Sequence, residues 1–381
     1  MKTKIAIIQS HPIQHFCPQF ASYSKIPGVE VTVFFGSDKG LQTYYDPQFK
    51  KYVQWKNIDL GSFENIILGN NNLENELSKH SPDIVIVYGY NNKIQKNAYK
   101  WAIRNYKRIF YISDSTSHQK EHPLKRKLKR LMYKRYFSHI DFCLSVGDSN
   151  EEIYRGYGIK NHQLIRTPFP IDIETINEKL KIKENIRTLI KSKYNIPDNH
   201  LIISSIGKLE EFKRHIDIIH LLKSLEALNI PTTAFIIGSG KCMETLIKAK
   251  DSLKSNKVFL TDFIPPSATI DFLCASDIYI HPSSREAHSL SISEAIYVGC
   301  PVILTDNCGS YGPTDDVQPG KNGFVYKTGE VDMLCKLVVN LKMNPQILKN
   351  FSNESTRIGQ NNQKLAHGAA LQVALNIIKT R

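Results

Sequence analysis

Residues 283–303 read SSREAHSLSISEAIYVGCPVI and point most directly to the fold of the chain. An apolar run that ends at His281 precedes this stretch and another begins at Pro301, so we expect a buried strand on each side. Between them a helix should begin near residues 289–291 and end at Gly299, because a glycine followed closely by a proline is typical of helix ends. Strand, loop, helix and strand in this order predict parallel strands covered by helices.

Similar apolar runs recur on both sides of this segment, separated by stretches long enough for helices. We predict strands at residues 5–9, 29–35, 84–88, 109–113, 142–146, 201–206, 233–237, 258–260, 278–281 and 301–305. The alternation predicts an α/β protein with two mostly parallel sheets. We expect an N-terminal domain at 1–170, a linker at 171–198, a second domain at 199–355, and a C-terminal helix at 356–381 that can pack back on the N-terminal domain.

The composition is that of a globular protein with an excess of positive charge. Of the 381 residues, 41% are hydrophobic and 23% are charged, enough to bury a sizeable core, which excludes a wholly disordered chain. There are 50 Lys and Arg against 36 Asp and Glu, a net charge of +14. This excess favours a polyanionic partner, such as nucleic acid, an anionic membrane surface or a phosphorylated substrate.

The cysteines and the N-terminus bear on where the protein works. The 7 cysteines form no Cys-x-x-Cys pair, so no zinc ribbon or redox pair is indicated, and their apolar surroundings fit a reducing compartment. The first apolar run is too short for a signal peptide, and no segment approaches the ~18 apolar residues of a membrane span. We expect a cytoplasmic protein, with any membrane contact peripheral and on the inner face of the cell membrane.

Two glutamates within the 283–303 segment are the first candidates for chemistry. Glu286 follows a predicted strand, and Glu294 lies in the first turns of the predicted helix. The amides of Ser289, Leu290 and Ser291 at the helix start have no intrahelical acceptor and can bind an anion. A structural alternative stays open, because Ser291-x-x-Glu294 has the spacing of a capping box and Glu286 could be an ordinary loop carboxylate.

This segment resembles the hallmark of the family 4 retaining glycosyltransferases (glycosyl transferases group 1), which have the GT-B fold. In these enzymes seven residues separate two glutamates, and Ala, a helix, Gly and Pro-Val-Ile follow the second. Glu286 and Glu294 have the same spacing here and the same residues after them. The resemblance implies two Rossmann-like domains facing each other across a cleft, with a nucleotide-sugar site in the second. Glu294 would accept hydrogen bonds from the ribose, and Glu286 would contact the transferred sugar. Sugar and diphosphate oxygens would be bound by the amides of Ala287, His288, Ser289, Leu290 and Ser291.

One departure from the family pattern lies directly after Glu286. Most members have Gly-Phe-Gly there, whereas this chain has Ala287, His288 and Ser289. Backbone amides remain available at these positions, so the departure leaves the preferred sugar open.

Further matches to the family lie upstream in the expected order. The stretch 201–213 resembles a family strand followed by Gly-Arg-Leu and a later Lys, with Gly207, Lys208 and Lys213 at those positions. The resemblance implies that both lysines lie against the donor diphosphate, where cations stabilise the departing nucleotide. The alternative is a solvated lysine pair at a helix start.

Two more loops after predicted strands match weakly. Gly238 belongs to a Gly-x-Gly turn, and such glycines permit a tight turn and close approach to a ligand. The backbone near Phe263 and Ile264 would frame the nucleotide base, by resemblance to the family. Ordinary turns are the alternative at each position.

The N-terminal half resembles the family less closely. His11 and Gln14 follow the first strand, where many members carry a glycine-rich loop, and could line the acceptor side of the cleft; a Ser-x-Pro helix cap is the alternative. Members often carry a histidine beyond the strand equivalent to 108–113 that contacts the donor sugar. Here that place holds Asp114, with His118 four residues on, and the choice between them stays open.

A basic segment at residues 120–136 carries much of the positive charge. Its Leu and Met residues recur at helical spacing, and the other faces carry Lys and Arg, among them Lys125, Arg126, Lys129 and Arg130. This pattern is typical of a helix lying on an anionic bilayer. The alternative is a solvated basic surface whose leucines pack on the core. Interleaved stacking aromatics and nucleic-acid-binding motifs are not evident, so no nucleic-acid partner is expected.

The resemblance as a whole implies a retaining glycosyltransferase. It would move a sugar from a nucleotide diphosphate sugar, UDP being the first expectation, to a saccharide or lipid-linked saccharide in cell-surface polysaccharide or glycoconjugate synthesis. No Asp-x-Asp lies at a predicted strand end, so no metal and no other cofactor is expected. Two alternatives remain: a nucleotide-sugar epimerase of the same fold, and a non-catalytic protein that binds an anionic membrane or nucleic acid.

Overall fold

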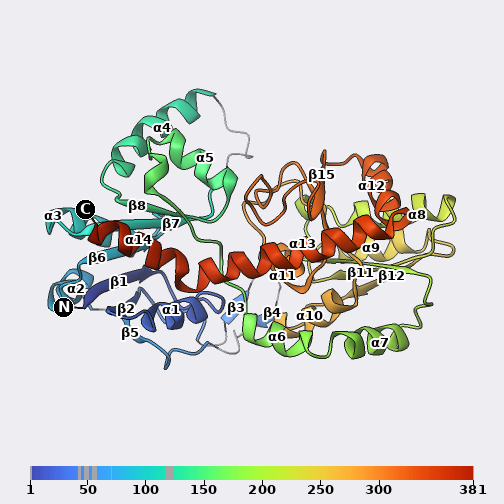
Figure 1. Ribbon diagram of the computed structural model, residues 1–381, viewed down its shortest axis with the longest axis horizontal. Helices are drawn as coiled ribbons and strands as arrows, with labels where there is room; N and C mark the ends of the chain where they lie inside the picture. Colours follow the sequence, from blue (N-terminus) through green and yellow to red (C-terminus); the bar gives the residue numbers. More distant parts are fainter. Residues whose placement is uncertain are drawn as a thin grey trace. The chain divides into compact units, whose positions relative to one another are not determined.

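The computed structural model describes residues 2–41, 44–46, 51–53, 58–69, 71–116 and 123–380; at 44–46, 51–53 and 123–129 only the backbone is described (Figure 1). The chain divides into two compact units. The N-terminal unit consists of Met1–Val146, Asn150–Pro170 and Asn362–Arg381, and the C-terminal unit consists of Gly147–Ser149 and Ile171–Asn361.

A seven-stranded parallel sheet forms the centre of the N-terminal unit. Its strands follow the order β5 (Glu64–Ile67), β2 (Val29–Phe35), β1 (Thr3–Gln9), β6 (Ile84–Tyr88), β7 (Arg108–Ser113), β8 (Phe142–Ser145) and β9 (Leu164–Arg166). Neighbouring residues of β1 point to opposite cores, Ile5 and Ile7 to one, Ala6 and Ile8 to the other. The central strands β6 and β7 are largely apolar and buried because both faces of the sheet are covered. A short antiparallel pair, β3 (Tyr44–Asp46) and β4 (Lys51–Val53), lies apart from this sheet.

Helices supply the other half of both N-terminal cores. On one face lie α1 (Cys17–Ser24) and α14 (Ala370–Lys379). On the other lie α2 (Leu73–His80), α3 (Lys93–Arg104) and the end of α4 (Pro123–Phe137). Helix α5 (Asp148–Gly156) follows β8. The C-terminal end of the chain thus contributes to the N-terminal unit, since Ala370 and Leu371 are buried in its core.

The C-terminal unit contains a six-stranded parallel sheet. Its strands follow the order β12 (Lys257–Thr261), β11 (Thr232–Ile237), β10 (Leu201–Ile206), β13 (Ile278–His281), β14 (Val302–Thr305) and β15 (Gly323–Tyr326). The chain moves outward from β10 to β12 and then returns to the other side of β10 with β13. In open α/β sheets, ligands bind at the carboxyl ends of the strands where the order reverses in this way. Here that point lies between β10 and β13.

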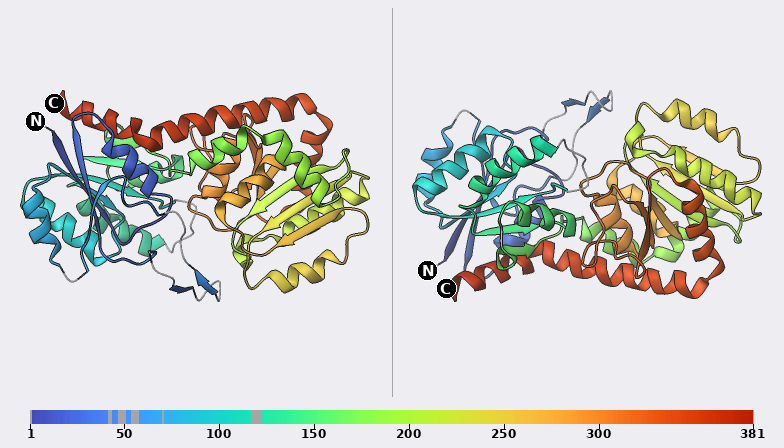
Figure 2. Two further views of the ribbon diagram at one scale, coloured as in Figure 1. Left: turned by 90° about the horizontal axis from the view of Figure 1, so that it is seen from below. Right: turned by 90° about the horizontal axis from the view of Figure 1, so that it is seen from above.

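Helices cover both faces of this sheet as well, as Figure 2 shows. One face carries α8 (Ile216–Ala227), α9 (Met243–Lys250), α12 (Val331–Met343) and part of α13 (Pro345–Lys364). The other carries α6 (Ile173–Leu180), α7 (Lys183–Lys193), α10 (Pro266–Ala275) and α11 (Leu290–Val298). Residues 171–198, which the sequence suggested as a linker, therefore form α6 and α7 of the C-terminal unit. They belong there because Ile176, Ile186 and Ile190 are buried in its core.

The fold prediction is confirmed at the level of class and layering, with two parallel Rossmann-like sheets in an α/β chain. The helix predicted to end the chain is interrupted at residues 365–369, where Gly368 adopts a φ of 123° that favours glycine. Among the described helices, none is both long enough and apolar enough to span a bilayer.

Candidate functional site

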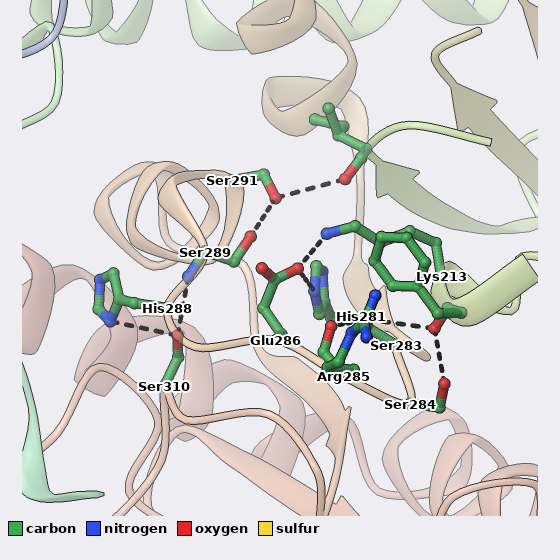
Figure 3. Close-up of polar contacts among 12 residues, drawn as sticks. Lys213, His281, Ser283, Ser284, Arg285, Glu286, His288, Ser289, Ser291 and Ser310 are labelled. Atoms are coloured by element: carbon green, nitrogen blue, oxygen red, sulfur yellow. Dashed lines mark hydrogen bonds and ion pairs between the residues drawn. The ribbon is translucent and has the colours of Figure 1, made fainter. Parts of the chain in front are cut away.

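The loops that follow β10 and β13 are joined by hydrogen bonds at the reversal point. After β10 the chain forms a 3-10 turn, η2 (Glu211–Lys213), and after β13 it forms the loop that leads to Glu286. The carbonyl oxygen of Phe212 accepts hydrogen bonds from the amide of Ser284 at 2.7 Å and from its hydroxyl at 3.0 Å (Figure 3). This double contact holds the lysine at the end of the turn beside the glutamate of the loop.

Glu286 lies between two nitrogen donors (Figure 3). It forms an ion pair with Lys213, and both side chains are mostly buried. The Nε2 atom of His281 lies 3.2 Å from the same carboxylate oxygen. Burial by itself raises the pKa of Glu286, but the hydrogen bond from His281 and the charge of Lys213 outweigh burial and lower the pKa to about 2. Glu286 is therefore an ionised acceptor near neutral pH, with no proton to donate.

His281 is a site residue that the sequence reasoning did not single out. Burial first, and the charge of Lys213, lower the pKa of His281 despite its bond to Glu286, so the ring stays neutral. Since ionised Glu286 can only accept, the ring hydrogen lies on Nε2. The available signal was a histidine at the end of a buried strand, five residues before Glu286.

His215 is a second residue that was missed. It is buried at the start of α8, and its Nδ1 atom has no hydrogen-bond partner among the described residues. Burial, followed by the charges of His281 and Lys213, lowers the pKa of His215 to about 3. The ring is thus a neutral neighbour of the lysine, and nothing in its position along the chain distinguished it from a core histidine.

Glu294 lies in α11 and is only partly buried. The N-cap of this helix is Ser289, without a side-chain capping bond, so Ser291 and Glu294 do not form the capping box that their spacing allowed. Within the described part of the chain, the Glu294 carboxylate has no hydrogen-bond or ion-pair partner. Burial, followed by the charge of Asp172, raises the pKa of Glu294 to about 8. The capping interpretation is wrong, and the carboxylate remains available to a ligand.

The start of α11 offers backbone amides beside these carboxylates. Leu290 and Ser291 are the first two helical residues, whose amides have no acceptor within the helix. The amide of Ser289 is already used, because it donates to the hydroxyl of Ser310 at 3.1 Å. The helix start can therefore bind an anion through two of the three amides that the sequence suggested.

The side chain of His288 is directed at the hydroxyls of Ser310 and Ser293. It is buried, with Nδ1 3.3 Å from the hydroxyl of Ser310 and Nε2 3.4 Å from a carboxylate oxygen of Asp316. His288, Asp315 and Asp316 offer metal-ligand atoms within 4.8 Å of one another. Asp315 accepts hydrogen bonds from the amides of Asp148 (2.6 Å) and Asp316 (2.8 Å), so protein donors already occupy its two oxygens. Only the backbone of His288 is therefore available to a ligand at the start of α11.

The remaining predicted donor residues lie at the same edge of the sheet. Lys208 is half-buried directly after β10. Gly238 has a φ of 146°, and a side chain there would overlap the carbonyl oxygen of Gly207, so a glycine is needed at position 238, where two strand ends meet. Phe263 follows β12 and is 44% exposed, whereas Ile264 packs against the core. Parallel strands place all these loops at one carboxyl edge, the edge at which such sheets bind ligands.

The predicted residues of the N-terminal unit are less closely organised. Nδ1 of His11 forms a hydrogen bond of 2.9 Å with the hydroxyl of Ser10. Burial first, and then the charge of Lys39, lower the pKa of His11. Gln14 is half-buried. The N-cap of α1 is Phe16, so the Ser-x-Pro cap considered as an alternative is wrong.

The choice between the two residues suggested after β7 is not settled by their positions. Asp114 is described and exposed. His118 lies outside the described residues. Both therefore stay predictions.

The basic helix exposes apolar side chains. Lys125, Arg126 and Lys129 lie in the part of α4 whose side chains are outside the described residues, and Arg130 donates from Nε to the carbonyl of Gly156 at 2.7 Å. Leu131 and Met132 are 62% and 68% exposed. The alternative that the apolar residues of this helix all pack on the core is wrong at these two positions.

The chain is similar in sequence to known glycosyltransferases. A family model described as glycosyl transferases group 1 matches residues 186–364. The poly(glycerol-phosphate) alpha-glucosyltransferase of Bacillus subtilis is 28% identical over 170 residues, 44% of this chain and 24% of that protein. A glycosyltransferase of Methanocaldococcus jannaschii is 25% identical over 206 residues, 53% of this chain and 46% of that protein. The chain thus matches less than half the length of these two relatives.

Solved structures match over the whole chain. The HepE protein of Anabaena in complex with UDP has a TM-score of 0.74 at 14% identity, with 100% of both chains covered. A glycosyltransferase from Rickettsia africae has a TM-score of 0.71 at 16% identity, again with 100% of both chains covered. At these identities the likeness shows the fold. The chain therefore has the fold of these glycosyltransferases, and residues 186–364 match the glycosyl transferases group 1 model.

Proposed function

We propose that this protein is a retaining glycosyltransferase that moves a sugar from a nucleotide diphosphate sugar to a saccharide or lipid-linked saccharide. The observation that carries the proposal is the meeting of the Lys213–Glu286 ion pair with the loop that leads into α11 at the reversal point of the C-terminal sheet. This arrangement offers positive charge and amides for a diphosphate and carboxylates for sugar hydroxyls. UDP is the proposed nucleotide, supported by the complex of UDP with HepE, a protein of the same fold.

The proposed roles follow from charge and protonation. Lys208 and Lys213 stabilise the charge that develops on the leaving diphosphate. Ionised Glu286 accepts hydrogen bonds from hydroxyls of the transferred sugar, and Glu294 accepts them from the ribose. The bond from the sugar's anomeric carbon to phosphate breaks, a bond to the acceptor oxygen forms on the same face, and the acceptor proton passes to the departing phosphate oxygen. No metal and no other cofactor takes part in this scheme.

A nucleotide-sugar epimerase of the same fold is the nearest rival. Its substrate would occupy the same pocket, because a diphosphate and a sugar need the same groups in both reactions. The two differ in their products: a transferase joins the sugar to an acceptor, whereas an epimerase releases it as the free epimer. Support for transfer comes from relatives such as the alpha-glucosyltransferase of Bacillus subtilis.

Purified protein incubated with UDP-, GDP- and ADP-sugars should release one nucleotide, and suitable saccharide acceptors should accelerate that release. Nucleotide release is measured by a coupled enzyme assay and the sugar product by mass spectrometry. A free epimerised sugar formed without acceptor would favour the epimerase. Binding of none of the nucleotide sugars, judged by calorimetry, would overturn both enzymatic functions.

We further propose that α4 binds an anionic membrane surface, because it exposes Leu131 and Met132 beside Lys134 and Arg135. Changing these two apolar residues to serine and these two basic residues to glutamine should lower binding to phosphatidylglycerol vesicles about tenfold or more, since each basic residue contributes about 1 kcal/mol at such a surface. Sedimentation with phosphatidylglycerol and phosphatidylcholine vesicles measures the effect.

A matched control for this variant lies on α8, at its end and on α9, in the C-terminal unit. Lys223→Gln and Lys248→Gln with Leu228→Ser and Ile247→Ser remove two exposed charges and two exposed apolar side chains, as the α4 variant does. This control should sediment like the wild type. Equal sedimentation of the α4 variant would leave that helix as an ordinary basic surface.

A further inference from the structure

A buried chain of hydrogen bonds runs from the start of α11 to Asp316. The amide of Ser289 donates to the hydroxyl of Ser310 at 3.1 Å, and this hydroxyl lies 3.3 Å from Nδ1 of His288 (Figure 3). Nε2 of His288 lies 3.4 Å from the hydroxyl oxygen of Ser293, and this hydroxyl donates to Oδ2 of Asp316 at 2.6 Å. The side chains of His288 and Asp316 are each only 1% exposed. These contacts join the start of α11 to the loop that contains Ser310 and Asp316.

The direction of the hydrogen bonds follows from what each group can do. The Ser289 amide only donates, so the Ser310 oxygen accepts from it and its own hydrogen is free to be donated to Nδ1 of His288. Nδ1 then accepts, so Nε2 is the donor and donates to the hydroxyl oxygen of Ser293, whose own hydrogen goes to Asp316. Every link therefore has one donor and one acceptor, and the chain ends on a carboxylate that only accepts.

The polar anchor stands where this chain departs from the family pattern. Ala287, His288 and Ser289 replace the Gly-Phe-Gly that the resemblance led us to expect after Glu286. A phenylalanine at position 288 could fill the same space but could neither accept from Ser310 nor donate to Ser293. Since the loop between Glu286 and α11 carries the amides of the proposed donor site, its anchoring decides where those amides lie.

We infer that His288, Ser310 and Asp316 act as positioning residues that hold the start of α11, so that its amides meet the donor's phosphate and sugar oxygens. This inference rests on the proposed function for the identity of the ligand. None of the three side chains contacts the donor. Their effect passes through the amide of Ser289, the N-cap residue, which fixes the two free amides that follow it.

The test compares Ser310→Ala, His288→Phe, their double variant and His288→Gln. Ser310→Ala and His288→Phe should each weaken nucleotide-sugar binding about tenfold, the usual scale for loss of one or two hydrogen bonds in a buried network. The double variant should be no weaker than the worse single variant, because both break the same chain. His288→Gln, which keeps an acceptor and a donor, should recover part of the affinity. Ser252→Ala, in which an exposed hydroxyl that donates only to the Ala249 carbonyl is lost, serves as the control.

Hydrogen exchange provides a readout that does not depend on activity. The amide of Ser289 should exchange faster in Ser310→Ala than in the wild type, while the melting temperature changes little. Faster exchange with unchanged donor affinity would overturn the positioning role, as would independent, additive losses in the double variant. If His288→Phe does not fold, Ser310→Ala alone decides. A wild type that binds no nucleotide sugar would reject the proposed function, whereas wild-type binding retained in all variants would reject only this inference.

Discussion

Replacing Lys213 with alanine should lower the rate of nucleotide release about 100- to 1,000-fold, because removing one group that stabilises charge in a transition state costs about 3–4 kcal/mol. Lys213 is held for this task by the contact between the η2 turn and the loop after β13, which brings its ammonium group to Glu286. Steady-state kinetics of nucleotide release with the best donor measures the loss. The effect should fall mainly on kcat, since the charge it stabilises develops as the nucleotide departs.

A second variant separates catalysis from stability. Lys213→Ala leaves the mostly buried Glu286 with the hydrogen bond from His281 but without its ion pair, and breaking a buried ion pair in this way costs about 3–5 kcal/mol. Adding Glu286→Gln should restore part of the melting temperature without restoring turnover. Lys181→Ala, which removes an exposed ion pair with Glu178, is the control and should keep the wild-type rate. Wild-type turnover in Lys213→Ala would remove this lysine from the proposed diphosphate site.

Replacing Glu294 with alanine should weaken donor binding about 10- to 100-fold, because a carboxylate that accepts two ribose hydroxyls contributes hydrogen bonds to a charged group. The same residue should make binding depend on pH. The pKa of Glu294 is raised to about 8 in the free protein, so the carboxylate is mostly protonated at pH 6 and becomes a full acceptor as the pH rises. Affinity for a nucleotide sugar should therefore increase about tenfold between about pH 6 and pH 8.5, as calorimetry can measure.

The neutral variant Glu294→Gln is the control for this pH dependence. Its donor affinity should be low and flat across the same pH range. The stability of the wild type should depend on pH in the opposite direction to its donor affinity. A carboxyl whose pKa is raised on folding binds more protons in the folded than in the unfolded state, so wild-type stability falls as pH rises from about 5 toward 8, by at most about 1.4 kcal/mol per pH unit. Glu294→Gln should lack this fall. A wild-type donor affinity that does not change across this pH range would overturn the role of Glu294 in donor binding.

The fold class could be predicted from the sequence because strand and helix patterns are local. The buried strands before and after residues 283–303 are apolar runs that no helix period explains, and Gly299 ends α11 with left-handed backbone as expected. Glu286 and Glu294 could be proposed as members of one site only from the family resemblance; the local pattern added that a strand end and the helix after it are close along the chain. The prediction that 171–198 is a linker was wrong. The many lysines of this segment suggested a solvated connector, whereas three of its isoleucines are buried in the core of the C-terminal unit.

The order of elements and the residue types at the strand ends follow from the chain alone: two α/β units, an acidic pair and lysines after a strand. Packing in three dimensions was needed to establish which of these groups have partners. Lys213 is 73 residues from Glu286 along the chain, and the ion pair between them forms because the reversal of strand order makes β10 and β13 neighbours. Likewise, burial without a partner raises the pKa of Glu294. Burial also raises the pKa of Glu286, but the two nitrogen donors beside its carboxylate outweigh burial and lower that pKa. Two glutamates of the same motif thus acquire opposite protonation behaviour, because desolvation and neighbouring charge are properties of the packed site and not of the chain.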